Sequence, residues 1–215
     1  MNIVNVSEEY KLAGYYLSNL RDSNLQKDRL SFCENVKRLS QILTWEFSKT
    51  LAFKKESINT PFSTYDRLVP DSSIIMLSIV RAGIPIQQVA MSMINCENAV
   101  FCTCEKNADG LRSAIFSGQL NVTNKILVVA ESIMTSASSM LCCLSEVVKI
   151  GRPSMIVILN LLSTPLSIDN IKEFEDKVAI GITLYTCGID DFTPGIRGTI
   201  PGLGDVGDLY YGLKK

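Results

Sequence analysis

Histidine is absent from the 215-residue sequence, and its absence excludes several classes of active site. Without imidazole there is no Ser-His-Asp triad, no Cys-His pair and no histidine ligand for a metal ion. Any chemistry must therefore depend on carboxylates, Arg and Lys side chains, hydroxyls, backbone amides, or a metal ion held by oxygen atoms.

An excess of charge of either sign is also missing. Twenty-one Lys and Arg residues stand against twenty-two Asp and Glu residues, which gives a formal net charge of −1. Proteins that bind nucleic acid usually carry a basic face, and proteins that bind anionic membranes carry basic clusters. The composition therefore predicts no nucleic-acid partner and no membrane partner.

Long apolar runs are missing as well, although 47% of the residues are hydrophobic. No run approaches the roughly 18 apolar residues that suggest a membrane-spanning helix. Residues Met1–Glu9 lack the basic segment and apolar run of a secretory signal. We therefore expect a cytoplasmic protein, folded as one domain over residues 1–215.

The seven cysteines are an odd number for a disulfide framework. The closest pairs along the chain are Cys102 with Cys104, and the adjacent Cys142 and Cys143. Neither pair has the spacing of a zinc site, so we expect no metal held by the protein alone. The simplest interpretation is that these cysteines are small buried hydrophobic residues.

Helical hydrophobic spacing dominates residues 1–60, which we expect to form N-terminal helices. Ser7 can cap a first helix that ends near Asn19, and a long helix follows from about Leu25 to Phe53. The α/β core is expected over residues 61–185, and residues 186–215 form the C-terminal segment.

The core alternates short apolar strands with helices, which indicates a parallel sheet covered on both faces. Helices are expected near Pro85 and at Ser138–Ile150, and residues 107–124 are expected to form a long loop or a hairpin. The expected strands are Ile74–Val80, Ala99–Thr103, Lys125–Ala130, Ser154–Leu162 and Val178–Tyr185. Ligands of such sheets bind in the loops at the carboxyl ends of the strands.

Three of these loops carry residues suited to ligands. Arg81–Gly83 offers a fork of donors beside a glycine and suits pyrophosphate, although a plain strand-to-helix turn can look the same. The hydroxyl-rich loop Ala130–Ser138 precedes a helix and suits a phosphate, although Ser and Thr also cap helices without a ligand. Pro201–Asp208, with three glycines and two aspartates, can bond the edge of a flat base or form a solvated terminal turn.

Three segments resemble the uracil phosphoribosyltransferase family, in the family's order and at its spacing, and the resemblance extends from end to end. It is greatest to the members from Bacteroidetes. The segments are Leu20–Asn24 (LRDSN, family LRDxN), Ser78–Pro85 (SIVRAGIP, family ILRAGLP) and Ile200–Asp208 (IPGLGDVGD, family VPGLGDAGD).

The resemblance implies a type I phosphoribosyltransferase fold, an α/β fold whose mostly parallel sheet is flanked by helices, with a small C-terminal hood that binds the base. It implies that uracil and phosphoribosyl pyrophosphate react to UMP and pyrophosphate, with Mg²⁺ accompanying phosphoribosyl pyrophosphate. It also implies a homodimer or a higher homo-oligomer.

Residue roles follow from the same resemblance. Arg81 and Asp205 are the expected catalytic residues: Arg81 holds the pyrophosphate, and Asp205 lies near phosphoribosyl pyrophosphate and its metal. Main-chain groups of Thr199, Gly204, Asp205 and Val206 are expected to frame uracil. The expected contacts of phosphoribosyl pyrophosphate are Arg81, Glu105, Lys106, Ala130, Glu131, Ser132, Ile133, Met134, Thr135, Ser136, Ala137, Ser138 and Asp205.

The loop at 130–138 departs from the family, which reads DPMLATGGS where this chain reads AESIMTSAS. Ala130 replaces the aspartate that accepts hydrogen bonds from the ribose, and the adjacent Glu131 is its potential substitute. Ser136 and Ala137 replace two glycines, and their Cβ atoms disfavour a close backbone approach and a positive φ.

Two further positions depart from the family pattern. Glu105 replaces a second pyrophosphate arginine, with Lys106 as its potential substitute, and Gly198 replaces a tyrosine. The changes gather on the phosphoribosyl side, whereas the base loop is kept. Three functions remain open: an enzyme with an altered pocket, an inactive paralogue that binds uracil or a nucleotide in a regulatory role, and a structural partner of an active subunit.

Overall fold

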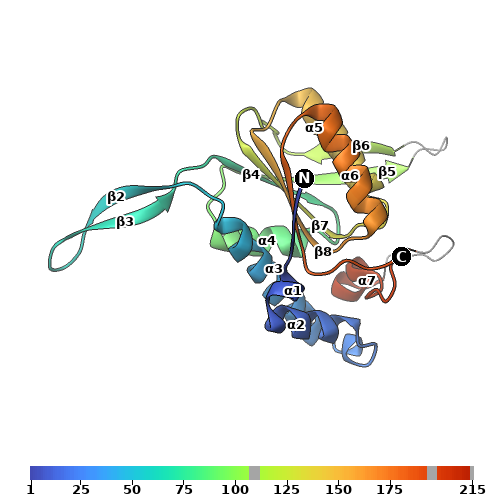
Figure 1. Cartoon of the computed structure of the whole chain (residues 1–215). Coiled ribbons are helices and arrows are strands. Elements are labelled where there is room, and N and C mark those ends of the chain that lie inside the picture. Colours follow the sequence, from blue (N-terminus) through green and yellow to red (C-terminus); the bar gives the residue numbers. More distant parts are fainter. Residues whose placement is uncertain (107–111, 193–197, 214–215) are drawn as a thin grey trace.

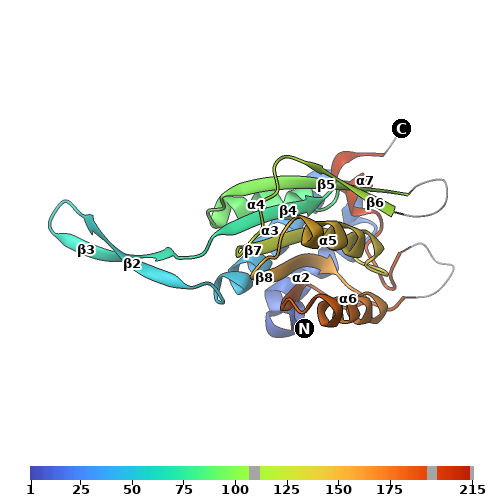
Figure 2. The ribbon, with the colours of Figure 1, turned by 90° about the horizontal axis from the view of Figure 1, so that it is seen from above.

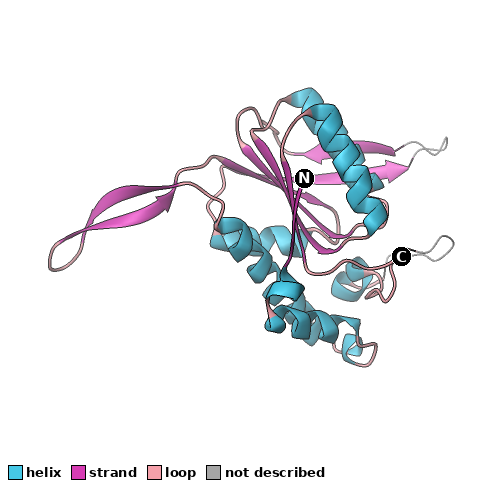
Figure 3. Cartoon of the chain, viewed as in Figure 1, coloured by secondary structure: helices cyan, strands magenta, loops and turns pink. Residues whose placement is uncertain are grey.

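A seven-stranded sheet with helices on both faces forms the centre of the computed structural model, which describes residues 1–106, 112–192 and 198–213 (Figures 1 and 3). Its strand order is β1-β9-β8-β7-β4-β5-β6, and every neighbouring pair is parallel except β5 and β6. The strands are β1 (Asn2–Asn5), β4 (Ile74–Ile79), β5 (Asn98–Lys106), β6 (Arg112–Ser117), β7 (Ile126–Ile133), β8 (Met155–Leu162) and β9 (Ile182–Thr186). The expected α/β fold with a mostly parallel sheet is confirmed.

The helices form one layer on each face of the sheet (Figure 1). On one face lie α1 (Val6–Glu9), α2 (Lys11–Arg21), the short 3-10 helix η1 (Leu25–Lys27), α3 (Arg29–Ser48) and α4 (Ile84–Met93). On the other lie α5 (Ser138–Ile150) and α6 (Pro165–Val178), while α7 (Val206–Tyr211) lies near the C-terminus. Two apolar cores result, one on each face of the sheet.

Local sequence explains how the elements start and end. Every residue of β4 is buried, as expected of a strand covered on both faces. Asp28 caps α3 by accepting hydrogen bonds from the backbone N–H groups of Leu30 and Ser31. Thr164 and Ser167 form a reciprocal capping box at the start of α6.

An antiparallel hairpin of β2 (Phe53–Asn59) and β3 (Thr64–Pro70) projects away from the rest of the molecule (Figure 2). The turn between its strands contains Thr60 and Pro61, which the sequence indicated as the end of the helical region. Large apolar side chains on this arm are exposed, and Phe62 is 99% exposed.

The expectation of an all-helical region 1–60 is wrong, because β1 and β2 lie within it. The first helix is divided at Tyr10, whose backbone is extended, and Ser7 lies inside α1 rather than at its cap. The long helix ends at Ser48, where the chain turns into the arm.

In the core, α5 and β8 lie where the sequence placed them, and residues 107–124 do contain a strand, β6, that makes a hairpin with β5. The helix α6 was not predicted. The strand expected at Val178–Tyr185 begins only at Ile182, because Val178 still belongs to α6. No helix among the described residues is long and apolar enough to cross a membrane.

Candidate active site at the carboxyl edge of the sheet

The three loops singled out in the sequence meet at the carboxyl edge of the sheet, and the turn Arg81–Gly83 after β4 lies between the other two. On one side, a Cβ placed on Gly83 would lie 2.2 Å from the backbone oxygen of Ala130 in β7. On the other, Arg81 Nη2 lies 2.5 Å from Asp208 Oδ1 in α7. Gly83 therefore allows a close approach to β7, while its own φ of −75° is ordinary.

The base loop, defined here as residues 199–208, is anchored by a buried carboxylate that follows β9. The side chain of Asp190 is 2% exposed and accepts from both terminal nitrogens of Arg21, at 2.9 and 2.6 Å. It also accepts from the Thr199 hydroxyl at 3.0 Å and the Gly202 N–H at 2.8 Å. Arg21 in turn donates to the Gly202 carbonyl at 2.9 Å. One ion pair therefore joins α2, the segment after β9 and the base loop.

These contacts hold the pKa of Asp190 below its ordinary value. Burial alone raises the pKa, but the Arg21 guanidinium, the Gly202 N–H and the Thr199 hydroxyl all favour the charged form. The carboxylate is therefore ionised across the physiological range, and it remains a strong acceptor for the base loop.

Glycine conformations shape the base loop further. Gly202 has a φ of +68°, and a Cβ there would lie 2.3 Å from the backbone oxygen of Thr199. Gly198, where the resemblance implies a tyrosine, has a φ of +126°. Residues with a side chain rarely adopt this conformation, so a tyrosine at 198 requires a different backbone. The adjacent residues 193–197 are outside the described part.

The residues expected to frame uracil lie together in this loop, with unequal exposure. Val206 is 2% exposed and belongs to the apolar core, and the Thr199 hydroxyl is engaged by Asp190. Both can offer a ligand only main-chain groups. Gly204 and Asp205 are exposed, and Asp205 caps α7 by accepting from the Asp208 N–H at 3.0 Å.

Arg81, the expected pyrophosphate residue, is paired with the carboxylate of Asp208. Besides Asp208, it donates to the Gly212 carbonyl at 3.4 Å, and its guanidinium lies 6.0 Å from the Tyr211 ring centre. Its buried Nε–H has no hydrogen-bond partner among the residues that the structure describes. The residue therefore retains a donor for a ligand, and an anionic ligand can also compete with Asp208 for the guanidinium.

The phosphoribosyl segment, residues 130–138, starts inside the sheet, because β7 continues to Ile133 rather than ending at Ala130. Side chains of a strand alternate between its faces. Ala130 belongs to the core on the α3 and α4 side, whereas Val129 belongs to the core on the α5 side, and Glu131 follows Val129 on that side near Cys104. The geometry therefore argues against Glu131 as a direct substitute for an acidic residue at 130.

The remaining side chains of this segment differ in solvent exposure. The side chains of Ser132, Met134 and Ala137 are buried, while Thr135, Ser136 and Ile133 are partly exposed and Ser138 is exposed. Thr135 and Ser136 present their carbonyl oxygens to α6 and its cap: the Thr164 hydroxyl donates to Thr135 at 2.5 Å and the Asn170 amide donates to Ser136 at 3.0 Å.

The start of α5 lacks a side-chain cap. Its N-cap residue is Ala137, which adopts a left-handed conformation with φ of 55° and has no side-chain acceptor for the first-turn amides. These N–H groups have no intrahelical acceptor. A phosphate oxygen is a natural partner for them.

Glu105 lies near the end of β5, exposed and in register with Ser113 of β6. Lys106 is the last residue of β5, and its side chain lies outside the described part. Glu105 thus places an acidic residue, where the resemblance implies an arginine, on the strand next to β4.

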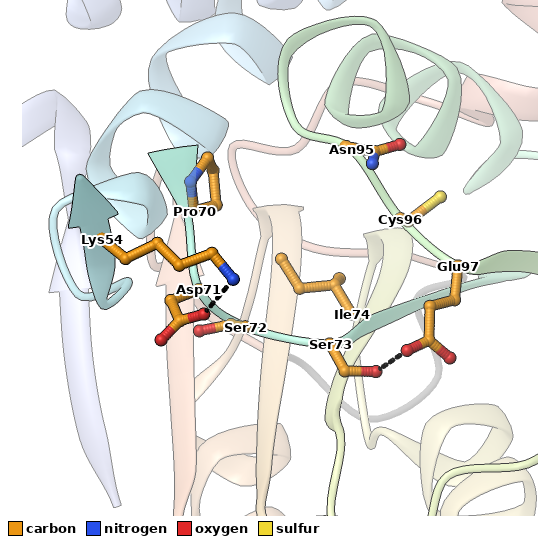
Figure 4. A pocket seen from close by; sticks show the side chains of 9 residues that line it. All are labelled: Lys54, Pro70, Asp71, Ser72, Ser73, Ile74, Asn95, Cys96 and Glu97. Carbon is orange, nitrogen blue, oxygen red and sulfur yellow. Dashed lines mark hydrogen bonds and ion pairs between the residues drawn. The ribbon is translucent and has the colours of Figure 1, made fainter. Parts of the chain in front are cut away.

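A polar hollow at the other end of the sheet is unsuited to be the active site (Figure 4). It lies at the base of the arm, where β4 and β5 begin. Its charged side chains are engaged with protein groups: Lys54 pairs with Asp71 at 2.8 Å, and Ser73 bonds to Glu97. Across the described ranges, no group of three or more Cys, Asp or Glu side chains is arranged to hold a metal ion.

Several contributors to the site were not identified from the sequence. Arg21 lies in the LRDSN segment, but its bond to a base-loop carbonyl required the fold. Gln26 donates to the Leu203 carbonyl at 3.0 Å. Neither Gln26 nor Asp190 belongs to the motifs found in the sequence. Asp208 was part of the base-loop motif without an assigned role.

The fold is an α/β fold in which the start of α5, the turn Arg81–Gly83 and the glycine-rich base loop lie at one edge of the sheet. A model of the family described as uracil phosphoribosyltransferase matches residues 7–213. The chain therefore belongs to the uracil phosphoribosyltransferase family.

Individual relatives agree with this assignment. The chain is 27% identical over 219 residues to a uracil phosphoribosyltransferase of Porphyromonas gingivalis, covering all of both chains. It is 26% identical over 189 residues to one from Methanothermobacter thermautotrophicus, covering 86% of this chain and 85% of the relative. Among solved structures, the AQ2163 protein of Aquifex aeolicus has the same fold, with a TM-score of 0.83, 20% identity and 98% of each chain covered.

Proposed function

We propose that the protein transfers the phosphoribosyl group of phosphoribosyl pyrophosphate to uracil, at a low rate. In this reaction a uracil nitrogen replaces pyrophosphate at the anomeric carbon of the ribose, and UMP is formed. The observation that carries the proposal is the base loop, which the buried ion pair of Asp190 with Arg21 holds beside Arg81. Such catalysis depends on positioning and on charge stabilisation.

The low rate follows from the phosphoribosyl segment. Ala130 provides no ribose acceptor, and Glu105 repels the pyrophosphate that an arginine would attract. Removing one oriented donor from a transition state commonly costs about 3 kcal/mol. The altered contacts together therefore leave slow turnover.

The same observations favour one alternative, an inactive paralogue that binds uracil or UMP and acts through a partner. Ala137 supports it, because it occupies a left-handed conformation that the family fills with glycine. The two functions share the base loop and differ in turnover.

Magnesium belongs to the proposal as a companion of phosphoribosyl pyrophosphate. Mg²⁺ in phosphate sites is often held by the substrate and water, with only one or two carboxylates from the protein. The exposed Asp205 fits this limited role. Bound Mg²⁺ would neutralise charge on the pyrophosphate, and Arg81 would orient that group.

We further propose a cytoplasmic homo-oligomer in which the arm contributes to the interface. The arm exposes large apolar side chains, namely Phe53, Phe62, Tyr65 and Leu68. A groove of about 490 Å³ lies between α2, α3 and α4 and contains the exposed side chains of Leu12, Trp45 and Met93. Light scattering of the purified chain tests this directly, and a Phe62→Ser variant should shift the mass toward that of a monomer.

Formation of labelled UMP from labelled uracil tests the enzymatic proposal, with the Porphyromonas gingivalis relative assayed alongside. We expect slow turnover that depends on Mg²⁺, together with binding of UMP. UMP binding without turnover supports the inactive paralogue. Absence of both turnover and binding contradicts both functions.

A further inference from the structure

Four cysteines that form two separate pairs in the sequence come together in the structure. Cys102 and Cys104 are two residues apart in β5 and therefore face the same side of the sheet. Cys142 and Cys143 lie in α5, which packs on that side. All seven cysteines lie in the described part of the chain and are thiols.

The four thiols lie close together across β5 and α5. The Sγ atoms of Cys102 and Cys104 are 3.7 Å apart. Cys143 is near enough to affect the pKa of Cys102, and Cys142 is near enough to affect the pKa of Cys104. Cys104 further donates to the Ser139 carbonyl in the first turn of α5 at 3.3 Å.

The pair Cys102 and Cys143 differs from the pair Cys104 and Cys142 in solvent exposure. Cys102 and Cys143 are 0% exposed, so a reagent cannot reach them in the folded chain. Cys104 and Cys142 are partly exposed. A bond within β5 is also unfavourable, because residues i and i+2 of an extended strand are about 6.6 Å apart, near the upper limit for a disulfide. The pair Cys104 and Cys142 is left as the reactive one.

We propose that Cys104 and Cys142 are a redox modification site, at which a low-molecular-weight disulfide converts the two thiols into one intramolecular disulfide between β5 and α5. One thiol, after losing its proton, attacks the reagent and forms a mixed disulfide, releasing one reagent thiol. The second then attacks the protein sulfur and releases the other reagent thiol. Two protein thiols are oxidised, and one reagent disulfide is reduced to two thiols.

The place of this bond links it to the phosphoribosyl segment. Cys104 immediately precedes Glu105, and α5 begins at the turn expected to hold phosphate. The bond would fix β5 against α5 and weaken the binding of phosphoribosyl pyrophosphate, a consequence that rests on the proposed function. The hydrogen bond with Cys102, burial and nearby Glu131 raise the pKa of Cys104, so little of this thiol is ionised and its own attack on a disulfide is slow.

Intact-mass spectrometry of the native chain after incubation with glutathione disulfide tests the site. We expect a loss of about 2 Da, reversed by dithiothreitol, with no retained glutathione. The matched variants are Cys104→Ser/Cys142→Ser, which should not lose this mass, and Cys102→Ser/Cys143→Ser, which should lose it as the native chain does. Fragmentation of the cross-linked peptide from the native chain locates the bond without any variant.

An unchanged mass, mixed or intermolecular disulfides alone, or a bond at Cys102 or Cys143 overturns the site. Calorimetry with phosphoribosyl pyrophosphate should give an affinity about fivefold or more lower after oxidation. Equal affinities overturn redox control of binding. No binding by the reduced chain contradicts the proposed function, while the disulfide is still judged by its mass.

Discussion

The base loop at 199–208 and the phosphoribosyl segment at 130–138 lie at one edge of the sheet, but different contacts hold them. A buried carboxylate, Asp190, accepts four hydrogen bonds, two from Arg21 of α2 and two from the base loop. Neutral side chains hold the phosphoribosyl segment through its carbonyl oxygens, as Asn170 does for Ser136. Charged side chains therefore hold the base loop, with Asp190 at the centre of their contacts, whereas neutral side chains support the other segment.

The strongest test of this difference is the substitution Asp190→Asn. It leaves Arg21 without its carboxylate, and removal of one partner from a buried ion pair costs about 3–5 kcal/mol. We expect a decrease of this size in the free energy of unfolding, measured with urea, and a weaker affinity for UMP. The control is Asp191→Asn, because Asp191 is adjacent and exposed. Equal effects of the two substitutions contradict the anchoring role.

The pH dependence of stability sharpens the same test. Because the pKa of Asp190 is lower in the folded chain than its ordinary value of about 3.9, its stabilising contribution is complete above that value. The contribution is lost as the pH falls through the folded pKa. The difference between the native chain and Asp190→Asn should therefore be constant from pH 7 to about 5 and shrink below about 4. A difference that grows on acidification is the contrary result.

A second substitution acts where the two regions meet. Gly83→Ala places a Cβ against the backbone oxygen of Ala130, which cannot rotate away. Overpacking of this kind costs about 1–3 kcal/mol. Gly181→Ala is the control, since no atom lies within 4 Å of its added Cβ. Thermal unfolding should separate the two variants, and matching melting temperatures would show that the turn and β7 adapt easily.

The smallest expected effect on stability concerns the start of α5. Ala137→Gly removes a left-handed alanine, which costs about 1–2 kcal/mol, but it also increases the entropy of the unfolded chain. We expect the free energy of unfolding to change by no more than about 1 kcal/mol, and the affinity for phosphate to rise. Ala179→Gly is the control, because Ala179 is also left-handed, at φ of 52°, but ends α6. An equal gain in phosphate affinity at both positions contradicts a specific anion site.

The sequence was most informative where periodicity and motifs are local. The buried strand β4, the helix α5 and the three ligand loops could be predicted because their signals lie within a few residues. The arm could not, since Phe53–Asn59 (FKKESIN) has only two apolar residues and lacks the alternation of a half-buried strand. The strand β1 was missed because four residues carry little pattern, and α6 because its polar face obscures a narrow apolar one.

Contacts between distant residues could not be predicted from the chain alone. Arg21 and Asp190 are separated by 169 positions, and only the fold brings the end of α2 to β9. The sequence also offered Glu131 as a substitute for the missing acid at Ala130. Strand alternation opposes this once β7 is seen to continue through Ile133. The boundary of one strand therefore decided the interpretation of the site.

The rate of UMP formation by the native chain and by a repaired variant, at saturating uracil and phosphoribosyl pyrophosphate, tests the account most directly. The repair combines Glu105→Arg, Ala130→Asp, Ser136→Gly and Ala137→Gly. The family segment has proline at the position of Glu131, but Glu131 is left in place because a proline there would disturb the pairing of this residue with Asn160 of β8. Since such residues act as a unit, we expect little from single changes and a gain of about 100-fold or more from the combination. A native chain as fast as its Porphyromonas gingivalis relative, or a folded, UMP-binding repaired variant with no gain, would contradict the account.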